Sequence, residues 1–454
     1  MTLIAYLRGF LQSFTGKNQT SIKQRLIEKV AGTFGLRVAS TGLAFLTNIL
    51  LARLLGIAGF GIYTYAFAWV RFLNFPATFG LDNLLVREIS IYQTKSNWNL
   101  ARGILSWTNW VVLLLSGAIA LIAIGFAVGF NLYSEPQMLW SFVVAMLMLP
   151  IMTLRNLRIA AMQGLHHIVI GLMPEYILSP ILIVTLTGGA YLILGENLTA
   201  VWAMGMRLVA VAITLVVGIV ILNRILPIKI KEATPQYTTQ AWVKSALPLA
   251  FLGATFVINT QADSLMLGAI QGSEAVGLYL PVSKGAQLIN FVTVAANTVL
   301  APTIASLYST GNRGKLQRVI VKGTRLVFGA AFVLTLGLVI FGRWYLLLFG
   351  AEFTAGYYAL SILCIGQLVN AATCAVSYLL VMTKYERLTA FSDGGGAILN
   401  VVLNAFLIPR WGIEGAAVAT SVSLIIVNII NAFFVSKKLN INATVIGNIF
   451  GKKI

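Results

Sequence analysis

The sequence predicts an all-α polytopic membrane protein with about 12 transmembrane helices, arranged as two pseudo-symmetric six-helix lobes around a central cationic cavity. Three observations predict this fold class. Residues of the AVILMFWYC set make up 58% of the 454 residues and charged residues only 10%, whereas a soluble domain usually carries roughly a quarter charged residues. The apolar residues form long runs with short polar interruptions. Basic residues concentrate in every second interruption, as expected for helices that cross a membrane in alternating directions.

Each long apolar run is long enough for a helix that crosses a bilayer. A bilayer core takes about 20 mainly apolar residues, and a helix closes its own backbone hydrogen bonds, as lipid requires. The predicted spans are residues 30–52, 60–81, 105–129, 137–158, 168–194, 199–223, 245–270, 276–308, 326–349, 355–382, 388–409 and 413–435. A shorter apolar stretch, residues 3–14, contains Arg8. We expect it to lie along the membrane surface as an amphipathic helix rather than to be a cleaved leader.

The distribution of charge predicts an even number of spans, with both termini in the cytoplasm. The chain has 32 Lys and Arg against 13 Asp and Glu, a net charge of +19. If the N-terminus is cytoplasmic, nearly all basic loop residues fall on that side, and the opposite side receives only Arg53, Arg343 and Arg410. Cytoplasmic loops of membrane proteins are enriched in Lys and Arg. This rule explains the basic excess, and we expect no nucleic-acid partner.

A weak internal repeat divides the chain into two similar halves. The repeated stretches are Leu55-Gly56 with Gly61-Ile62-Tyr63, which recur as Leu267-Gly268 with Gly277-Leu278-Tyr279, and Gly195, which recurs as Gly412. Halves with an even number of spans share one orientation, so an axis along the membrane normal relates them. The predicted segments are a cytoplasmic N-terminal segment (1–29), a first lobe (30–226), a cytoplasmic linker (227–244), a second lobe (245–436) and a cytoplasmic basic tail (437–454).

Seven charged residues lie within the predicted spans. They are the basic residues Arg37, Arg71, Arg207 and Lys284 and the acidic residues Glu175, Asp263 and Asp393. A charge at mid-helix costs roughly 2.5–3.5 kcal/mol on insertion scales, so such residues usually face a polar interior. The structural alternative is that residues near helix ends reach the surface or pair with loop charges. Arg71 and Asp263 lie too deep in their spans for that to be easy.

The excess of positive charge in this interior predicts an anionic ligand. A low dielectric strengthens the attraction, and arginine binds phosphate or diphosphate groups in a bidentate manner. Neighbouring amides would suit sugar hydroxyls. The predicted substrate site is Arg37, Arg71, Arg207 and Lys284, with the amides Asn74 and Gln287. Neither the adjacent pair His166-His167 nor the two cysteines form a metal-ligand pattern, so we expect no metal site and no cofactor.

Several ordered motifs carry a resemblance to a known family. They are Ala52-Arg53-Leu54-Leu55-Gly56 with Gly59-Phe60-Gly61-Ile62-Tyr63, Ala246-Leu247-Pro248, Asp263 with Met266-Leu267-Gly268, and the run Asn400, Leu403-Asn404, Leu407-Ile408-Pro409, Gly412-Ile413, Gly415-Ala416-Ala417 and Thr420. Together they extend over nearly the whole chain. In these residues the chain resembles the Wzx-type polysaccharide flippases of the multidrug/oligosaccharidyl-lipid/polysaccharide (MOP) exporter superfamily.

The resemblance implies a flippase that carries lipid-linked oligosaccharide by alternating access between two lobes. The expected substrate is an undecaprenyl-diphosphate-linked oligosaccharide, moved from the inner to the outer leaflet of a bacterial or archaeal cytoplasmic membrane, with polysaccharide assembly proteins as partners. We also expect coupling to a Na⁺ or H⁺ gradient through Asp263, Glu175 or Asp393. Related lipid II flippases hold the diphosphate with arginines on early helices of each lobe, but they carry two further helices that this chain lacks.

Two other functions stay open at this stage. A drug/cation antiporter of the same superfamily would need an acidic interior, whereas the charges predicted here are mainly basic. A membrane-embedded polysaccharide polymerase or ligase would need outer loops that present an acid, a base or arginines to the substrate. The predicted outer loops are only a few residues long.

Overall fold

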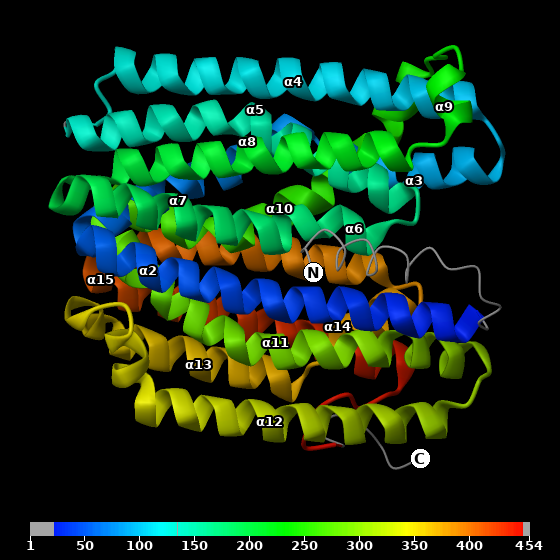
Figure 1. Cartoon of the computed structure of the whole chain (residues 1–454). Coiled ribbons are helices and arrows are strands. Elements are labelled where there is room, and N and C mark those ends of the chain that lie inside the picture. The colour runs from blue at the N-terminus through cyan, green and yellow to red at the C-terminus, as the bar shows by residue number, and fades with distance from the viewer. Residues whose placement is uncertain (1–21, 134, 448–454) are drawn as a thin grey trace, which may run out of the picture.

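A computed structural model of the chain describes residues 22–133 and 135–447, and helices make up nearly all of them (Figure 1). The elements are α2 (Ile22–Thr78), α3 (Leu81–Thr94), α4 (Trp98–Gly129), α5 (Pro136–Gly164), α6 (Ile168–Met173), η1 (Pro174–Leu178), α7 (Ser179–Leu194), η2 (Gly195–Asn197), α8 (Ala200–Ile225), α9 (Ile228–Glu232), α10 (Thr239–Gln271), α11 (Ser273–Ser309), α12 (Arg313–Leu347), η3 (Ala351–Gly356), α13 (Tyr357–Ala372), α14 (Val376–Met382) and α15 (Glu386–Leu439). The surface helix predicted at residues 3–14 and the end of the basic tail lie outside the described residues.

The long helices run side by side in one bundle, as a multi-pass membrane protein requires (Figure 1). Among the described residues, ten helices are long and apolar enough to cross a membrane. Two of them contain a break in the helical backbone, at Gly56 in α2 and at Gly412 in α15. A positive φ at these residues favours glycine. The prediction of twelve spans depends on dividing both helices there, and it stays a prediction.

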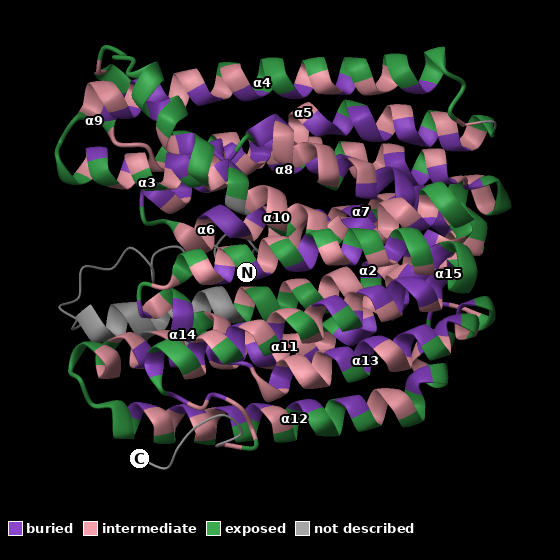
Figure 2. Ribbon diagram, turned by 180° about the vertical axis from the view of Figure 1, so that it is seen from behind, coloured by how far each residue is buried: buried purple, intermediate pink, exposed green. Residues whose placement is uncertain are grey.

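The outer surface of the bundle is apolar where lipid would contact it. Figure 2 shows exposed residues on the outward faces of the helices and buried residues between them. Several of the most exposed side chains are large and apolar, such as Leu192 and Ile193 (both 86% exposed) and Leu326 (76% exposed). A water-soluble monomer rarely exposes large contiguous apolar patches. The exposed apolar surface therefore agrees with a lipid environment.

The corner glycines of the two halves share their backbone conformations. Gly56 has φ 64° and ψ −179°, and Gly272, 216 positions later, has φ 89° and ψ 172°. Gly195 (φ 57°, ψ −130°) and Gly412 (φ 54°, ψ −128°) match in the same way, 217 positions apart. The structure also corrects one pairing of the repeat. The partner of Gly56 is Gly272 and not Gly268, which lies inside α10, because two similar Leu-Gly pairs do not show where a helix breaks.

The second half of α2 lies in the middle of the bundle. α2 packs against α5, α7 and α8 and also against α10 and α11. At the end of the bundle that carries Gly56 and Gly272, which we call the corner end, α2 and α11 touch at Gly61 and Gly277. A Cβ atom at Gly277 would lie 2.9 Å from the Cα atom of Gly61. Arg53 closes the same end by donating from Nε to the carbonyl oxygen of Leu348 at 2.7 Å.

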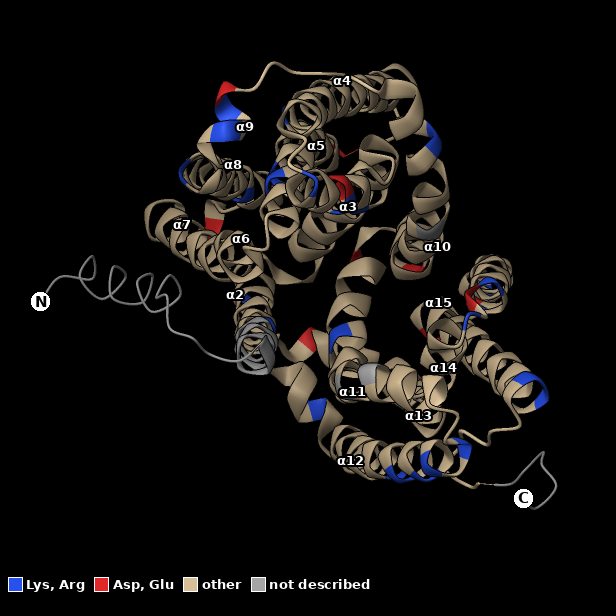
Figure 3. Ribbon diagram, turned by 90° about the vertical axis from the view of Figure 1, so that its right-hand side faces the viewer, with Lys and Arg blue, Asp and Glu red and all other residues tan. Residues whose placement is uncertain are grey.

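The opposite end, which we call the linker end, carries two elements that the sequence did not predict. Figure 3 views the bundle from this end, where α3 and α9 lie. α3 is an amphipathic helix whose apolar face is buried, and α9 lies in the predicted cytoplasmic linker. Residues 82–104 contain no apolar run of membrane length, and for that reason we predicted no helix there.

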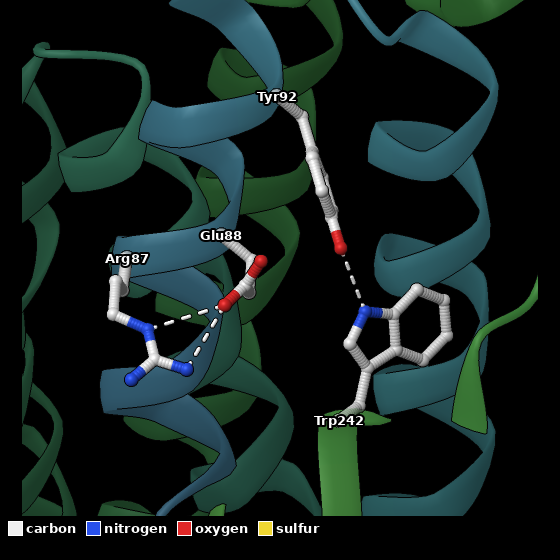
Figure 4. A network of polar contacts seen from close by, with 4 residues as sticks. All are labelled: Arg87, Glu88, Tyr92 and Trp242. Carbon is white, nitrogen blue, oxygen red and sulfur yellow. Dashed lines mark hydrogen bonds and ion pairs between the residues drawn. The ribbon is translucent and has the colours of Figure 1, made fainter. Parts of the chain in front are cut away.

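The linker is fixed to the first half of the chain. Trp242, only 2% exposed, donates from Nε1 to the hydroxyl of Tyr92 in α3 at 2.9 Å (Figure 4). The same figure shows the neighbouring ion pair between Arg87 and Glu88, at 2.9 Å. Arg102 of α4 also donates to the carbonyl oxygen of Ala233 at 3.1 Å. The start of α10 is therefore anchored to α3 and α4.

Candidate functional site

Three of the four predicted cations lie together where the two halves meet. Arg71 comes from the second half of α2, Arg207 from α8 and Lys284 from α11. Both guanidinium groups are close enough to Lys284 for their charges to act on its ammonium group, and Arg207 also acts on Arg71. We call these three residues the cationic cluster.

The cationic cluster lies at membrane depth. At about 1.5 Å of rise per residue, Arg207 lies about 10 Å from the start of α8, Lys284 about 17 Å from the start of α11, and Arg71 about 22 Å from the corner at Gly56. The Arg71 side chain is nevertheless exposed, and Arg207 and Lys284 are partly exposed. A ligand can therefore reach the cationic cluster although it lies deep in the bundle.

Two aromatic residues of α2 support the guanidinium groups. The Cζ atom of Arg207 lies 3.4 Å from the ring centroid of Phe67, and that of Arg71 lies 4.6 Å from the same centroid. Arg207 also donates from Nη1 to the hydroxyl oxygen of Tyr63 at 2.5 Å. Neither aromatic residue is among the site residues predicted from the sequence. The spacing Tyr63, Phe67, Arg71 is a signal that could have found them, because residues four apart share one face of a helix.

The two predicted amides, Gln287 and Asn74, lie near the cationic cluster but have different hydrogen-bond partners. Lys284 donates from Nζ to Oε1 of Gln287 at 3.0 Å, and Gln287 is exposed. Asn74 lies three residues after Arg71 and accepts a hydrogen bond from Asn156 of α5 at 3.3 Å. Gln287 is thus placed to meet a ligand beside Lys284, whereas Asn74 also links α2 to α5.

The fourth predicted cation, Arg37, lies in the first half of α2 and is exposed. Within the described residues, the contacts that join Arg71, Arg207 and Lys284 do not include it. The structure therefore places Arg37 on the same helix as Arg71 but does not bring it into the cationic cluster.

Glu175 lies in η1, a π-helical turn between α6 and α7. Its Oε1 atom accepts from Nη2 of Arg155 at 2.9 Å, and the Arg155 side chain is 6% exposed. The charge of Glu175 also acts on Arg71. π-helical turns occur frequently at functional sites. Glu175 thus lies between a buried structural arginine and the cationic cluster.

A polar pocket of about 220 Å³ lies beside Glu175. Its polar lining includes Asp82, Asn83, Asn156, Gln163 and Tyr176. Burial raises the pKa of the Asp82 carboxyl group above its ordinary value, because a low dielectric disfavours the charged form.

Asp263 lies in α10 and is surrounded by neutral hydrogen-bond donors. Its Oδ2 atom accepts from the hydroxyls of Thr420 at 2.6 Å and Tyr279 at 2.7 Å. Its Oδ1 atom accepts from the amide groups of Asn404 at 2.8 Å and Asn400 at 3.4 Å. These four donors, which the sequence analysis did not assign to a site, come from α11 and from both parts of α15. We call Asp263 and its four donors the carboxylate site.

Asp393, the third predicted acid, lies at the linker-end part of α15. It lines a smaller pocket of about 150 Å³ together with Thr255 and Asn259 of α10 and with apolar residues. The predicted equivalence of Asp393 and Glu175 does not extend to their partners, because Glu175 has an arginine at 2.9 Å and Asp393 faces neutral residues in its pocket.

The arrangement can bind an anion in one place and stabilise a carboxylate in another. The three cations of the cationic cluster carry more positive charge than Glu175, the one carboxylate of the described residues whose charge acts on Arg71, can neutralise, and Glu175 is already paired. Guanidinium groups suit phosphate oxygens geometrically. The carboxylate site holds a negative charge with hydrogen bonds alone, which is the environment that a proton or a small cation would enter.

Two curated proteins of Haloferax volcanii are similar to this chain over most of its length. The "Probable flippase AglR" is 22% identical over 411 residues, which cover 88% of this chain and 81% of the relative. The "Probable low-salt glycan biosynthesis flippase Agl15" is 24% identical over 419 residues, 91% of this chain and 83% of the relative.

Solved structures of the MOP superfamily share the fold. An inward-facing MATE-family multidrug transporter aligns with a TM-score of 0.72 at 13% identity and covers 88% of this chain and 94% of its own. The lipid II flippase MurJ in an inward closed conformation aligns with a TM-score of 0.71 at 14% identity, over 90% of this chain and 87% of its own. At these identities the likeness shows the fold alone. A family model described as "Polysaccharide biosynthesis protein" matches residues 26–308, more than half of the sequence, and the chain belongs to this family.

Proposed function

We propose that this protein is a flippase that moves lipid-linked oligosaccharide across the membrane, from the cytoplasmic to the outer leaflet. The observation that carries the proposal is the cationic cluster at membrane depth. Arg71 and Arg207 of the first half lie on the same Phe67 ring, and their charges act on Lys284 of the second half. An anionic headgroup is what such a site binds. The names of the two Haloferax relatives, both flippases and one of them for glycan biosynthesis, support this class of substrate.

The finer features of the substrate follow from chemistry and from the resemblance. The carrier is a polyprenyl lipid, specifically undecaprenyl diphosphate, whose phosphates contact the cationic cluster while its apolar chain stays in the lipid. Gln287, exposed beside Lys284, meets the sugar hydroxyls. The protein acts in a cytoplasmic membrane with both termini inside, and it serves assembly proteins that build a surface polysaccharide.

Transport proceeds by alternating access between the two halves. The cationic cluster takes residues from both halves, so the phosphate binds where they must separate. At the corner end, Gly61 meets Gly277 and Arg53 holds the end of α12, so the two halves are in contact at this end.

The carboxylate site couples transport to an ion gradient. Asp263 has four neutral donors and no cation among its hydrogen-bond partners, so a proton or Na⁺ would neutralise its charge. The Oδ1 atom of Asn404 is buried beside it without a hydrogen-bond partner, and oxygen atoms are suitable ligands for hard cations. Glu175 and Asp393 are the further candidates from the sequence.

An antiporter for cationic drugs is the second candidate, because a MATE transporter shares the fold. The cationic cluster argues against it. A cationic drug at that site would meet three positive charges, and like charges in a low dielectric repel strongly.

Reconstitution tests the proposal. Purified protein in liposomes should move a fluorescent polyprenyl-diphosphate-linked oligosaccharide between leaflets, while protein-free liposomes should not. A control with a fluorescent phospholipid detects leakage or general scrambling. Equal movement of both lipids, or no movement of the oligosaccharide lipid, would contradict the proposed function.

A further inference from the structure

We propose that Phe67 and Tyr63 are positioning residues, whose side chains hold the guanidinium groups of Arg71 and Arg207 in place for phosphate oxygens before the substrate arrives. This inference rests on the proposed function, because it concerns the same anion site. The two residues are uncharged, and they act on the substrate only through the arginines that they hold.

The need for such residues comes from the substrate-free transporter. After each transport event the cationic cluster is left without its anion, and its three positive charges repel one another. Without a further attraction, the flexible arginine side chains would turn away from each other. The next substrate would then have to reassemble the site, and the ordering would weaken its binding.

The ring of Phe67 supplies that attraction. The face of an aromatic ring is electrostatically negative and attracts a cation within about 6 Å of its centroid. The Cζ atoms of Arg207 and Arg71 lie 3.4 Å and 4.6 Å from this centroid. Phe67 is only 9% exposed, so its ring is held by packing. One fixed ring therefore stabilises two like-charged groups from different helices.

The shared ring also limits how far apart the two groups lie. Their Cζ atoms are separated by at most about 8 Å, the sum of 3.4 Å and 4.6 Å. A phosphate group accepts charge-assisted hydrogen bonds at roughly 2.7–2.9 Å on several oxygens. Two guanidinium groups held within this distance can bind oxygens of the same phosphate or diphosphate group.

Tyr63 fixes the direction of Arg207. Its hydroxyl oxygen accepts a hydrogen bond from Nη1 of Arg207 at 2.5 Å, and Tyr63 is 1% exposed. One donor of the guanidinium group is thereby occupied. The remaining donors of a planar guanidinium group are fixed in direction once one edge is held, and they are the ones available to a phosphate.

The alternative is that these aromatic side chains only fill space, and matched variants separate the two explanations. Phe67→Leu removes the ring face but keeps an apolar side chain, whereas Phe67→Tyr keeps the face. Phe72→Leu is the control, because Phe72 lies on the same helix and packs on Trp69, with ring centroids 6.1 Å apart. Tyr63→Phe removes only the hydroxyl that Arg207 contacts.

The experiment measures binding of farnesyl diphosphate and farnesyl monophosphate to the purified full-length protein in nanodiscs, together with its thermal stability. We expect Phe67→Leu to weaken binding roughly two- to thirty-fold, the range of cation–π contributions. Phe67→Tyr and Phe72→Leu should stay within about two-fold of wild type. Tyr63→Phe should weaken binding several-fold. Its melting temperature should stay close to that of the wild type.

The outcomes also separate this inference from the proposed function. If wild type binds neither phosphate lipid, both proposals are overturned. If wild type binds but Phe67→Leu and Tyr63→Phe bind as tightly, or Phe72→Leu loses as much affinity as Phe67→Leu, only the positioning role is overturned. A preference for one of the two farnesyl lipids would show whether the site is built for one phosphate or two.

Discussion

Tyr63 and Tyr279 occupy corresponding places in the two halves of the chain, 216 positions apart, and their hydroxyl groups contact opposite charges. Tyr63 accepts a hydrogen bond from Arg207, whereas Tyr279 donates one to Asp263 at 2.7 Å. Both are almost completely buried, at 1% and 3% exposure. The phenol hydroxyl can do both, because it is a donor and an acceptor.

The difference shows which parts of the repeat are structural and which have specialised. Asn74 and Asn290, also 216 positions apart, each accept a hydrogen bond from another asparagine, Asn156 and Asn370 respectively. These amide pairs link helices in the same way in both halves. The charged partners of the tyrosines do not correspond. In the first half, Tyr63 contacts a cation of the cationic cluster, which has too few neighbouring carboxylates to neutralise it. In the second half, Tyr279 contacts a carboxylate that is surrounded by neutral donors.

The largest expected effect comes from Arg71→Ala. This change removes one cation and its bidentate contacts from the cationic cluster, and charge-assisted hydrogen bonds contribute about 1.5–3 kcal/mol each. We expect flipping of the oligosaccharide lipid, and export of surface polysaccharide in cells, to fall at least about a hundred-fold while the protein remains in the membrane at normal levels. Arg343→Ala is the control. Arg343 is also an arginine on an aromatic ring, but it lies in α12 and contacts Tyr357 of α13, outside the cationic cluster. Full export by Arg71→Ala would contradict the site.

Asp263→Asn should act on a different property. The variant keeps the shape of the side chain but loses the charge that four donors stabilise. We expect the flipping rate to become insensitive to imposed Na⁺ and H⁺ gradients, with phosphate-lipid binding changed less than about two-fold. The measurement is flipping in proteoliposomes with each gradient set separately. The coupling assignment fails if wild-type flipping is already unaffected when both gradients are collapsed.

Glu175→Gln tests a carboxylate that, unlike Asp263, has a cationic partner. Breaking a buried ion pair from one side costs about 3–5 kcal/mol, and the partial exposure of Glu175 (31%) reduces this to about 1–3 kcal/mol. Thermal unfolding in detergent should show the loss. The double variant Glu175→Gln/Arg155→Met should recover part of it, because no unpaired charge remains. As a surface control, Glu196→Gln, which changes an exposed carboxylate, should shift stability by less than about 0.5 kcal/mol. A stable Glu175→Gln single variant would show that the pair with Arg155 is not structural.

The smallest effects should come from removing one hydroxyl in each half. Tyr279→Phe takes one of four donors from Asp263 and should alter the ion dependence of flipping only a few-fold, in line with about 1 kcal/mol for one hydrogen bond. It should leave phosphate-lipid binding unchanged. Tyr63→Phe should do the reverse. If both variants affect the same property, the two tyrosines have not specialised as their partners indicate.

The fold class could be predicted from the sequence because lipid imposes a strong pattern. Runs of about 20 apolar residues and the placement of Lys and Arg carry that pattern without any knowledge of tertiary contacts. Elements outside the lipid were missed. α3 is short and amphipathic, and the segment that contains it has no signal of membrane length.

The candidate site was predicted in part. Charged residues in apolar segments are easy to find in a sequence, and the structure brings three of the four basic residues together. The residues that contact these charges are not easy to find. Phe67 is one of many aromatic residues in apolar runs, and Asn404 lies 141 positions from Asp263. One sequence contains no information on which distant helices pack together. The four donors of Asp263 could therefore not be predicted as its partners, although they lie in recognisable sequence patterns.

The contact between Gly61 and Gly277 has a consequence for the history of the chain. The two residues are repeat equivalents that meet each other, so in a dimer of two identical half-length chains they would be a single residue touching its own copy on the symmetry axis. Any side chain gained there by such an ancestor would have met the partner's backbone twice, as a Cβ atom at Gly61 would meet the carbonyl oxygen of Ser273 and one at Gly277 the Cα atom of Gly61. A glycine at this position is thus a requirement that a duplicated chain would carry in both copies at once.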